Sequence, residues 1–479
     1  MRAATCPPAD TRLPSGFSVR LLAGVRVRDG GGTVIGGDLA SVLYLKPPAA
    51  RSLSGDGTVQ VRDPVTAALC RLLLDRGFAA PWWSQAPAPD RAATDVTVVV
   101  PVRDRPDGLA RLLAALPPGV PVIVVDDGSI DQAGCARIAA RHGATVRWHA
   151  RPRGPAAARN TGLAGVTTPF VAFCDSDVVP VRGWLAGLRR HFDDPALGLV
   201  GPRVLGPEPR PGDNWISRYE AARSALDLGA APAGVRPHGR ISYLSSACLL
   251  ARVTAVRAGF DQSLRVAEDV DLVWRLVSAG WRVRYEPGCV VRHEHRSTFA
   301  AWLGRKAYYG TGASLLAGRH GAAVAPLVLT PWMAAVGVSA LAQRRWSLPV
   351  ATVVAALTTL RIGRRLTRSR RPLATAAALT ARGVTAVARQ TTSALLRHHW
   401  PLALGAAVWS HRARRALLVA AVVDGALDHR ADRPALDPVR FFVARRLDDL
   451  AYGAGLWAGA ARTRSAGALI PSLRMTRRR

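Results

Sequence analysis

Two aspartates one residue apart follow an apolar run that is typical of a buried strand. The run is VAFC, and Asp175 and Asp177 come directly after it. If the chain turns here, both carboxylates can face the same space and bind a hard divalent cation, Mg²⁺ or Mn²⁺. Such a cation could be shared with a diphosphate and screen the charge on a departing nucleotide diphosphate. The pair therefore indicates metal-assisted group transfer.

A second acidic group stands far downstream, at the head of the helix-like run VDLVWRLVSAG. It contains Glu268, Asp269 and Asp271. Carboxylates in the first turn of a helix are stabilised by the helix dipole, so the group alone leaves a structural role open. Its position after a Gly-Phe-Asp turn favours a role in chemistry.

The elements that must position these carboxylates are strands and helices in alternation. From residue 96, the apolar runs VTVVVPV and VPVIVV alternate with the helix-like segments DGLARLLAAL and QAGCARIAARHG. Strands that are apolar throughout, separated by helices, predict an α/β fold with a mostly parallel sheet covered on both faces. Ligands of such sheets lie beyond the carboxyl ends of the strands.

Three polar clusters fall at these strand ends. They are Arg103-Asp104, Asp126-Asp127 and Asp175-Ser176-Asp177. Any one of them could be a simple cap. Because three occur in one predicted sheet, we expect them to converge on a single crevice.

The basic charge of the chain is concentrated toward its end. The 479 residues hold 65 Lys and Arg against 33 Asp and Glu, and residues 301–479 hold 28 of the former and 6 of the latter. Long Ala, Leu and Val runs interleave with these arginines, and this fits an anionic membrane surface better than a nucleic acid, whose binding would need interleaved aromatic residues. We expect no nucleic-acid partner.

The best candidate membrane segment is residues 321–343, which carry no charge. With the shorter run 346–360 it could form a hairpin that dips into the cytoplasmic leaflet; the alternative is an Ala-rich helical bundle packed on the rest of the protein.

The N-terminus lacks an apolar signal region and no cysteines have C-x-x-C spacing. We therefore expect a cell-membrane location with the catalytic domain on the cytoplasmic side.

Five motifs, in this order and spacing, resemble the family 2 glycosyltransferases of the GT-A fold: VVVPVRDRPDGL, VIVVDDGSID, GPAAARNTGL, FCDSDVVP and AEDVDLVWRLVSAGW. The resemblance spans about residues 96 to 300. It implies a Rossmann-like GT-A sheet and an inverting transfer of a sugar from a nucleotide-sugar donor, usually a UDP-sugar. It also implies a divalent metal cation, Mn²⁺ or Mg²⁺.

The resemblance assigns roles at the nucleotide end of the site by position. The residues that would border the nucleotide are Pro101, Arg103 and Asp104. Asp126 or Asp127 would hold the base and ribose.

It also assigns the residues nearer the reacting sugar. Arg159 and Asn160 would face the diphosphate, and Asp175 and Asp177 would be the DxD pair, with Asp177 the direct metal ligand. Asp269 would be the general base that takes the proton of the acceptor hydroxyl. His293 or His295 would either add a ligand to the metal or the diphosphate, or be solvated loop histidines.

The regions before and after residues 96 to 300 make the resemblance more specific. The pattern of residues 1–90 predicts a small strand-and-helix module. We expect Asp63 to cap its helix and Gly77 to end it. The segment YLKPPAARSL, followed by this helix, makes the module resemble winged-helix modules that bind precursor peptides. We divide the chain into this module, a glycosyltransferase domain at 91–305, and a helical basic region at 306–479.

The three parts together resemble the glycosyltransferases of the mycofactocin system. This implies a peptide-derived acceptor, the redox cofactor premycofactocin, and glucose as the sugar, with UDP-glucose as the donor. An alternative with the same catalytic residues is a membrane-associated enzyme that acts on a polyprenyl lipid or a cell-envelope glycan.

Overall fold

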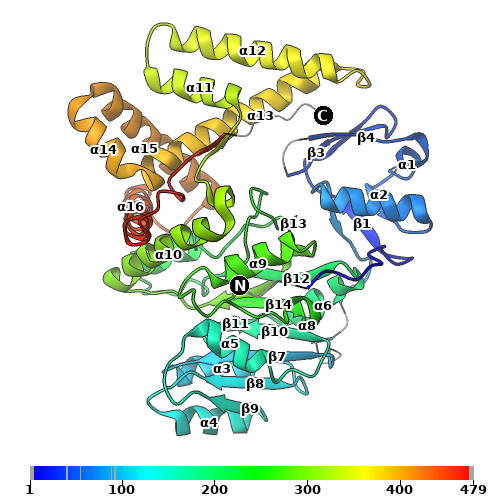
Figure 1. Cartoon of the computed structure of the whole chain (residues 1–479), viewed down its shortest axis with the longest axis vertical. Helices are drawn as coiled ribbons and strands as arrows, with labels where there is room; N and C mark the ends of the chain where they lie inside the picture. Colours follow the sequence, from blue (N-terminus) through cyan, green and yellow to red (C-terminus); the bar gives the residue numbers. More distant parts are fainter. Residues whose placement is uncertain (1–4, 39–40, 54, 88, 91–92, 474–479) are drawn as a thin grey trace.

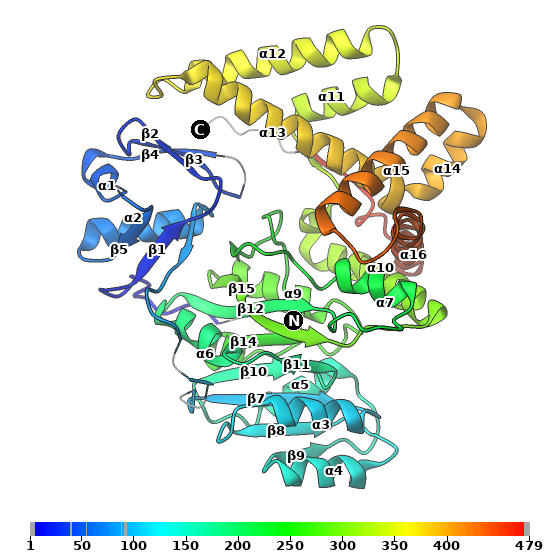
Figure 2. The same cartoon turned by 180° about the vertical axis from the view of Figure 1, so that it is seen from behind.

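The computed structural model describes residues 5–38, 41–53, 55–87, 89–90 and 93–473. Figure 1 shows a large central sheet with its helices, a small N-terminal module beside one end of it, and a group of C-terminal helices on the same side of the sheet as the module. The view from behind shows the module and the C-terminal helices on opposite sides of the same end of the molecule (Figure 2), and Arg28 of the module reaches the hydroxyl of Thr375 in the C-terminal region at 3.4 Å.

The central sheet has, among the described residues, nine strands in the order β11-β15-β12-β14-β10-β7-β8-β9, with β13 paired to β15. Neighbours are parallel from β9 to β10, and β14 then runs antiparallel between β10 and β12. The expected α/β sheet is confirmed, with a parallel part that carries the polar clusters and a mixed part beyond it. The strands are β7 (Val96–Val102), β8 (Val122–Asp126), β9 (Thr145–Trp148), β10 (Phe170–Cys174), β11 (Val178–Pro180), β12 (Leu197–Leu205), β13 (Ala233–Gly234), β14 (Cys248–Arg252) and β15 (Arg282–His293).

Helices cover both faces of this sheet. The side chains of β7 alternate between the faces: Val98 and Val100 join one buried cluster and Val99 joins the other. The first cluster is closed by α3 (Pro106–Ala115), α4 (Gln132–Arg141) and α6 (Trp184–Arg189), and the second by α5 (Pro155–Leu163), α8 (Val253–Val256) and α9 (Glu268–Ser278). Burial on both faces explains why these strands are apolar at every position.

The N-terminal module consists, as far as it is described, of two three-stranded sheets and two helices. The sheet orders are β5-β1-β6 and β2-β3-β4. Asp63 caps the second helix as expected, accepting a hydrogen bond from the amide of Thr66 at 2.8 Å, and Gly77 follows the helix with a positive φ of 69°. The elements are β1 (Ser18–Leu21), β2 (Arg26–Arg28), β3 (Thr33–Gly36), β4 (Ser41–Tyr44), α1 (Pro47–Arg51), β5 (Thr58–Gln60), α2 (Pro64–Asp75) and β6 (Ala79–Pro81).

The C-terminal region is helical, as expected, but the candidate membrane segment does not form one continuous helix. Residues 321–343 break into a 3-10 turn (Gly321–Val324), the two-residue strand β16 (Val328–Leu329) and the helix α11 (Pro331–Ala342). Pro326 interrupts the helix and Pro331 begins a new one, because proline cannot donate a backbone hydrogen bond within a helix. Over the residues that the structure describes, no helix has both the length and the apolarity that a membrane crossing requires.

The remaining C-terminal helices form a bundle. They are α12 (Ser347–Arg365), α13 (Pro372–Ser393), the π-helical turn η4 (Ala394–His398), α14 (Trp400–Trp409), α15 (His411–Asp432) and α16 (Pro438–Thr463), with the short strand β17 (Ser472–Leu473) after them. Helix α10 (Phe299–His320) leaves the sheet after β15 and joins the bundle to the sheet.

Helices α10 and α16 cross at very short range. A Cβ atom on Gly455 of α16 would lie 1.8 Å from the carbonyl oxygen of Ala307, and one on Gly310 of α10 would lie 2.2 Å from that of Tyr452. Only glycine permits this approach. Beside it, the ammonium of Lys306 is buried between Glu220 at 2.7 Å and Asp448 at 3.0 Å. The crossing therefore holds α16 at a fixed distance from the sheet.

Candidate active site

A cavity of about 1200 Å³ lies where the sheet, helix α9, helix α10 and the C-terminal bundle meet. Asp175 and Asp177 reach it from the end of β10, Asp269 from the head of α9, and His293 from the end of β15. Two carboxylate groups that lie about ninety residues apart in sequence thus share one space, as the sequence predicts.

Arg159 of α5 holds two of the carboxylates together. Its guanidinium is buried and binds Asp175 at 2.5 Å and Glu268 at 2.9 Å. Burial disfavours the charged form, but these two carboxylates outweigh burial and raise the pKa of Arg159. Burial also raises the pKa of Asp175, against the opposing effect of Arg159. Arg159 therefore links α5 to both carboxylates, and its expected place beside the diphosphate stays a prediction.

Asp177 lies between two basic groups. Arg105 binds one carboxylate oxygen at 2.8 Å, and Nε2 of His293 lies 3.5 Å from the other. The antiparallel pairing of β11 with β15 sets Val178 opposite His293, and this brings the histidine to the carboxylate. His295 also lines the cavity, and burial lowers its pKa.

Few protein ligands in this cavity are placed to hold a divalent cation. No three His, Cys, Asp or Glu side chains within the described ranges come close enough to hold a metal ion by themselves. Mg²⁺ and Mn²⁺ in nucleotide enzymes commonly take one or two protein ligands and complete their shell with phosphate oxygens and water. Asp177 with His293 offers two such ligands, so the donor set fits a cation that arrives with a diphosphate.

Asp269 is half-buried at the first turn of α9, where Ala267 enters the helix with a positive φ of 64°. The backbone amides of Ser246 and Val270 donate to its carboxylate at 3.1 and 2.8 Å. Burial, and next the charge of Glu268, raise the pKa of Asp269 to about 7, although both hydrogen bonds oppose the rise. A carboxyl group with a pKa near neutrality can accept a proton from a substrate hydroxyl.

Hydrogen bonds link the strand-end clusters to one another. The amide of Asp104 donates to the hydroxyl of Ser129, and the amide of Ile130 donates to the carboxylate of Asp104. A Cβ atom on Gly108 of α3 would lie 2.5 Å from the carbonyl oxygen of Ser176, so the start of α3 rests on the Asp175–Asp177 turn. The three clusters therefore lie close together at this edge of the sheet, but of their residues only Asp175 and Asp177 line the cavity, so a single shared crevice stays a prediction.

The two neighbouring aspartates at the predicted nucleotide end, Asp126 and Asp127, make different hydrogen bonds. Asp127 accepts bonds from the amides of Arg153 and Gly154 at 2.8 and 2.7 Å and lies 2.6 Å from Nδ1 of His149. Both its oxygens are therefore used to fix the loop that leads to α5. Asp126 accepts from Ser129 at 2.8 Å, and its other oxygen is buried without a partner. Asp126 is only 1% exposed, so its contact with a nucleotide stays a prediction.

The other residues assigned to the nucleotide are on the same edge. Pro101 lies buried within β7, and Arg103, just past its end, is exposed and lies 3.4 Å from Asp104. Both stay predictions as nucleotide contacts. Neither is part of the cavity lining that contains Asp269.

Asn160, which the resemblance places facing the diphosphate, is bonded to another part of the protein. Its side-chain amide donates to the carbonyl of Phe260 and its oxygen accepts from the amide of the same residue, each at 2.8 Å. It therefore fixes the turn that precedes α9, and it does not line the cavity.

Several cavity residues were not identified from the sequence. They come from the loop before β14, from the start of α10 and from the C-terminal bundle: Tyr243, Arg296, Arg305, Tyr309, Arg397, His398 and Tyr452. The run RKAYYG at 305–310, which follows His293 and His295 at a short distance, was a local signal, because it sets basic and aromatic residues together.

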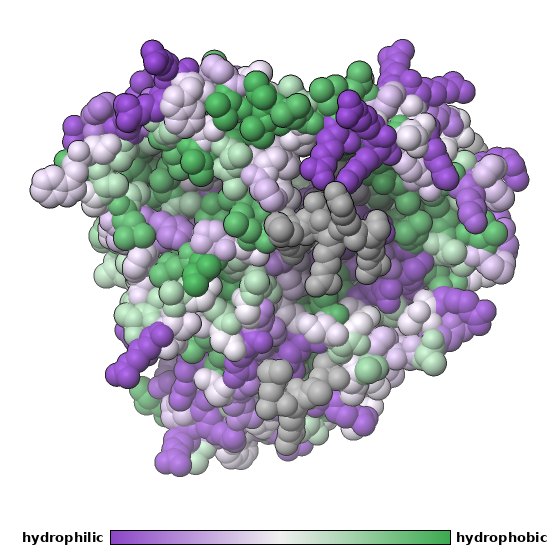
Figure 3. Space-filling model, turned by 45° about the horizontal axis from the view of Figure 1, so that its top comes forward, coloured by the Kyte–Doolittle hydropathy of each residue, from purple (hydrophilic) through white to green (hydrophobic). Residues whose placement is uncertain are grey.

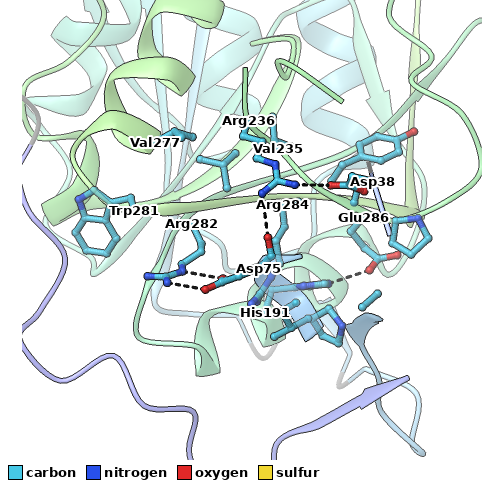
Figure 4. A pocket seen from close by; sticks show the side chains of 18 of the residues that line it. Asp38, Asp75, His191, Val235, Arg236, Val277, Trp281, Arg282, Arg284 and Glu286 are labelled. Carbon is cyan, nitrogen blue, oxygen red and sulfur yellow. Dashed lines mark hydrogen bonds and ion pairs between the residues drawn. The ribbon is translucent and has the colours of Figure 1, made fainter. Parts of the chain in front are cut away.

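A second, smaller cavity of about 260 Å³ lies between the N-terminal module and β15. Figure 4 shows that its charged groups face one another: Arg282 binds Asp75 at 2.8 Å, and Arg236 reaches Asp38 at 3.7 Å. These pairs join the module to the catalytic sheet. The cavity contains none of the assigned catalytic residues, so we regard it as part of that interface.

Comparisons with known proteins show what the chain is similar to. The family described as Glycosyl transferase family 2 matches residues 97–257. The "Pre-mycofactocin glycosyltransferase" of Mycobacterium tuberculosis is 45% identical over 97% of this chain and 99% of its own. The "Succinoglycan biosynthesis protein ExoU" of Rhizobium meliloti is 28% identical over 47% of this chain and 71% of its own. A solved mannosyltransferase from Pyrobaculum calidifontis, in complex with GDP-Man and Mn²⁺, covers 65% of this chain and 90% of its own at 22% identity and a TM-score of 0.37.

Proposed function

Because this chain belongs to glycosyltransferase family 2, we propose that it transfers glucose from UDP-glucose to a hydroxyl of premycofactocin with inversion at the anomeric carbon. One observation carries the chemistry: a carboxyl group with a pKa of about 7, Asp269, shares a cavity with the Asp175 and Asp177 pair. The likeness to the pre-mycofactocin enzyme supports the acceptor, since it extends over the N-terminal module and the C-terminal bundle as well as the catalytic sheet.

Asp269 is the general base of the proposed reaction. It accepts the proton of the acceptor hydroxyl while the new bond forms between that oxygen and the anomeric carbon. The bond from the anomeric carbon to the phosphate oxygen breaks, and its electron pair leaves with UDP. The amides of Ser246 and Val270 keep the carboxylate in place.

The opposite end of the cavity receives the charge of the leaving group. A divalent cation, when bound, would neutralise charge on the diphosphate, and Asp177 and His293 are the residues that would hold it. Arg159 keeps Asp175 at the edge of this site, since it binds that carboxylate at 2.5 Å. Arg296 and Arg305 also line the cavity, and cations there favour an anionic donor.

Mass spectrometry tests the proposal. The purified chain is incubated with UDP-glucose and Mn²⁺ and offered premycofactocin in one reaction and a polyprenyl phosphate in another. We expect a hexose to be added to premycofactocin alone. Addition to the lipid alone would favour the alternative, a transferase of membrane glycans, and addition to neither would refute both acceptors.

We further propose that the chain acts at the cytoplasmic face of the cell membrane, with α12 lying on anionic lipid. Leu348, Val353 and Leu357 of this helix are 77%, 55% and 60% exposed. The arginines that end α12 and follow it are Arg361, Arg364, Arg365, Arg368, Arg370 and Arg371. Figure 3 shows apolar side chains next to strongly hydrophilic ones along the upper edge of this face. Exposed apolar residues beside arginines favour an interfacial position over a crossing.

A further inference from the structure

We propose that Tyr243, Tyr452 and His398 form the subsite that binds the acceptor, and that this subsite selects a neutral, flat ring. The inference rests on the proposed function, since it concerns the acceptor of that reaction. It assigns a role in specificity to the C-terminal bundle, which the family motifs do not reach.

The bundle contributes directly to the catalytic cavity. Tyr452 comes from α16, and Arg397 and His398 come from η4, yet all three line the same space as Asp269. The close crossing of α10 and α16 fixes this arrangement, because Gly455, three residues after Tyr452, lies against the backbone of Ala307. Tyr452 is therefore held at the cavity wall by packed helices.

Aromatic rings gather at this wall. The ring of Tyr452 lies under the guanidinium of Arg397, with 3.9 Å from the central carbon to the ring centre, and edge-on to the ring of His398 at 6.2 Å. Tyr243 donates from its hydroxyl to the carbonyl of Ala225 at 3.3 Å. The charge of Asp269 is among the causes that raise the pKa of Tyr243, after burial, so this ring adjoins the base.

Charge divides the cavity into two ends. Near Asp177, burial and then the neighbouring guanidinium groups of Arg105 and Arg305 lower the pKa of Arg296, so cations crowd there and suit a diphosphate. At the aromatic end, Arg397 is neutralised by Asp448 at 3.2 Å and Asp449 at 3.1 Å.

His398 carries no charge at neutral pH. Burial, and next the charge of Arg397, lower its pKa to about 4. With Arg397 neutralised, the aromatic end therefore favours a neutral ligand, in contrast to the cationic end beside Asp177.

The size of the cavity allows both ligands at once. Pockets for single small molecules measure roughly 300 to 1000 Å³, and this cavity measures about 1200 Å³. A donor at the cationic end would leave space for a ring against Tyr243 and Tyr452, beside the carboxylate of Asp269. Aromatic side chains supply large contact area to such rings.

Kinetics of three variants test the subsite. Tyr452→Ala removes the ring, Tyr452→Phe keeps it without the hydroxyl, and Leu450→Ala is a control on the same helix, at a side chain that is 37% exposed and does not line the cavity. We expect the KM for premycofactocin to rise roughly tenfold in Tyr452→Ala, as for the loss of a good aromatic contact. It should stay within about twofold of wild type in the other two. The affinity for UDP with Mn²⁺ should not change in any of them.

An unchanged acceptor KM in Tyr452→Ala, or a loss of UDP affinity equal to the KM effect, would overturn the proposal. If Tyr452→Ala does not fold, Tyr243→Leu takes its place with the same expectation. Quenching of tryptophan fluorescence by N-acetyl-tyrosinamide and by cellobiose tests the subsite without turnover. Binding of N-acetyl-tyrosinamide that weakens in the Tyr452→Ala or Tyr243→Leu variant supports a subsite for a flat ring, and binding of cellobiose in preference to it would contradict that selectivity. Binding of neither to the wild-type chain would contradict it, even if sugar transfer itself is found.

Discussion

Nη2 of Arg159 lies 2.5 Å from Oδ1 of Asp175, and this contact joins helix α5 to the end of β10 inside the catalytic cavity. The same guanidinium binds Glu268, the neighbour of the assigned base. Arg159→Met would leave both carboxylates without their buried partner. We expect it to lower the free energy of unfolding by about 3 to 5 kcal/mol, measured by urea denaturation.

The matched control for this change is Arg153→Met, at an exposed side chain of the loop that precedes α5. It should change the free energy of unfolding by less than about 0.5 kcal/mol. If Arg159→Met and wild type have the same free energy of unfolding, the buried ion pairs of Arg159 make no net contribution to stability.

The pH dependence of transfer follows from the pKa of Asp269. Since the pKa is raised from 3.8 to about 7, the carboxyl group is protonated below neutrality and cannot act as a base there. We expect kcat/KM to rise with pH through about 7 and then level off, measured with UDP-glucose in excess. A profile that is flat from pH 5 to 8 would contradict the assignment.

The same group affects stability in the opposite direction. Because the pKa of Asp269 is raised, the folded state binds its proton more tightly than the unfolded state does. The contribution of Asp269 to the free energy of unfolding therefore falls as pH rises from 3.8 to about 7. Asp269→Asn cannot titrate, so the variant does not lose this stability as pH rises. The Tm of the variant should therefore rise relative to wild type across this window, and a constant difference would argue against the shift.

Asp177→Ala tests the metal ligands. Without this carboxylate, Mn²⁺ should no longer strengthen the binding of UDP, because the diphosphate would lack a cation held by the protein. Isothermal titration calorimetry with and without Mn²⁺ measures this. Asp131→Asn, at the exposed cap of α4, should bind as wild type does. If Mn²⁺ still strengthens UDP binding in Asp177→Ala, another residue holds the cation.

The proposed membrane contact depends on the exposed apolar residues of α12. Changing both Leu348 and Leu357 to Gln should abolish most binding to vesicles of phosphatidylcholine and phosphatidylglycerol, since burying each leucine contributes roughly 1.5 to 3 kcal/mol. Flotation measures the bound fraction. Val65→Gln, at a residue of α2 that is 47% exposed, is the control and should bind normally. Undiminished binding by the double variant would place the contact elsewhere.

Local patterns predicted the parts of the site that lie at strand ends. The apolar runs fixed where strands stop, so Asp104, Asp126 and Asp175 could be expected at one edge of a sheet. Asp63 was found as a helix cap because the capping pattern is contained within four residues. Both inferences needed only short-range information.

What the patterns missed depends on long-range packing. The amide of Asn160 is used by Phe260, one hundred residues later, and nothing near Asn160 in sequence signals that. Tyr452 enters the cavity only because glycines of α16 allow contact with α10. The apolar composition of residues 321–343 resembled a membrane segment, but two prolines divide it, and the bundle formed in its place.

The replacement Asp269→Asn tests the central claim most directly. It keeps the size of the side chain and an oxygen that can accept from Ser246 or Val270, but it removes the proton acceptor. Sugar transfer to premycofactocin and UDP affinity are measured on the same preparation. We predict that transfer falls by ~10²-fold or more while UDP affinity stays as in wild type. Full transfer activity in this variant would contradict the account and leave Asp269 with a structural role at the head of α9.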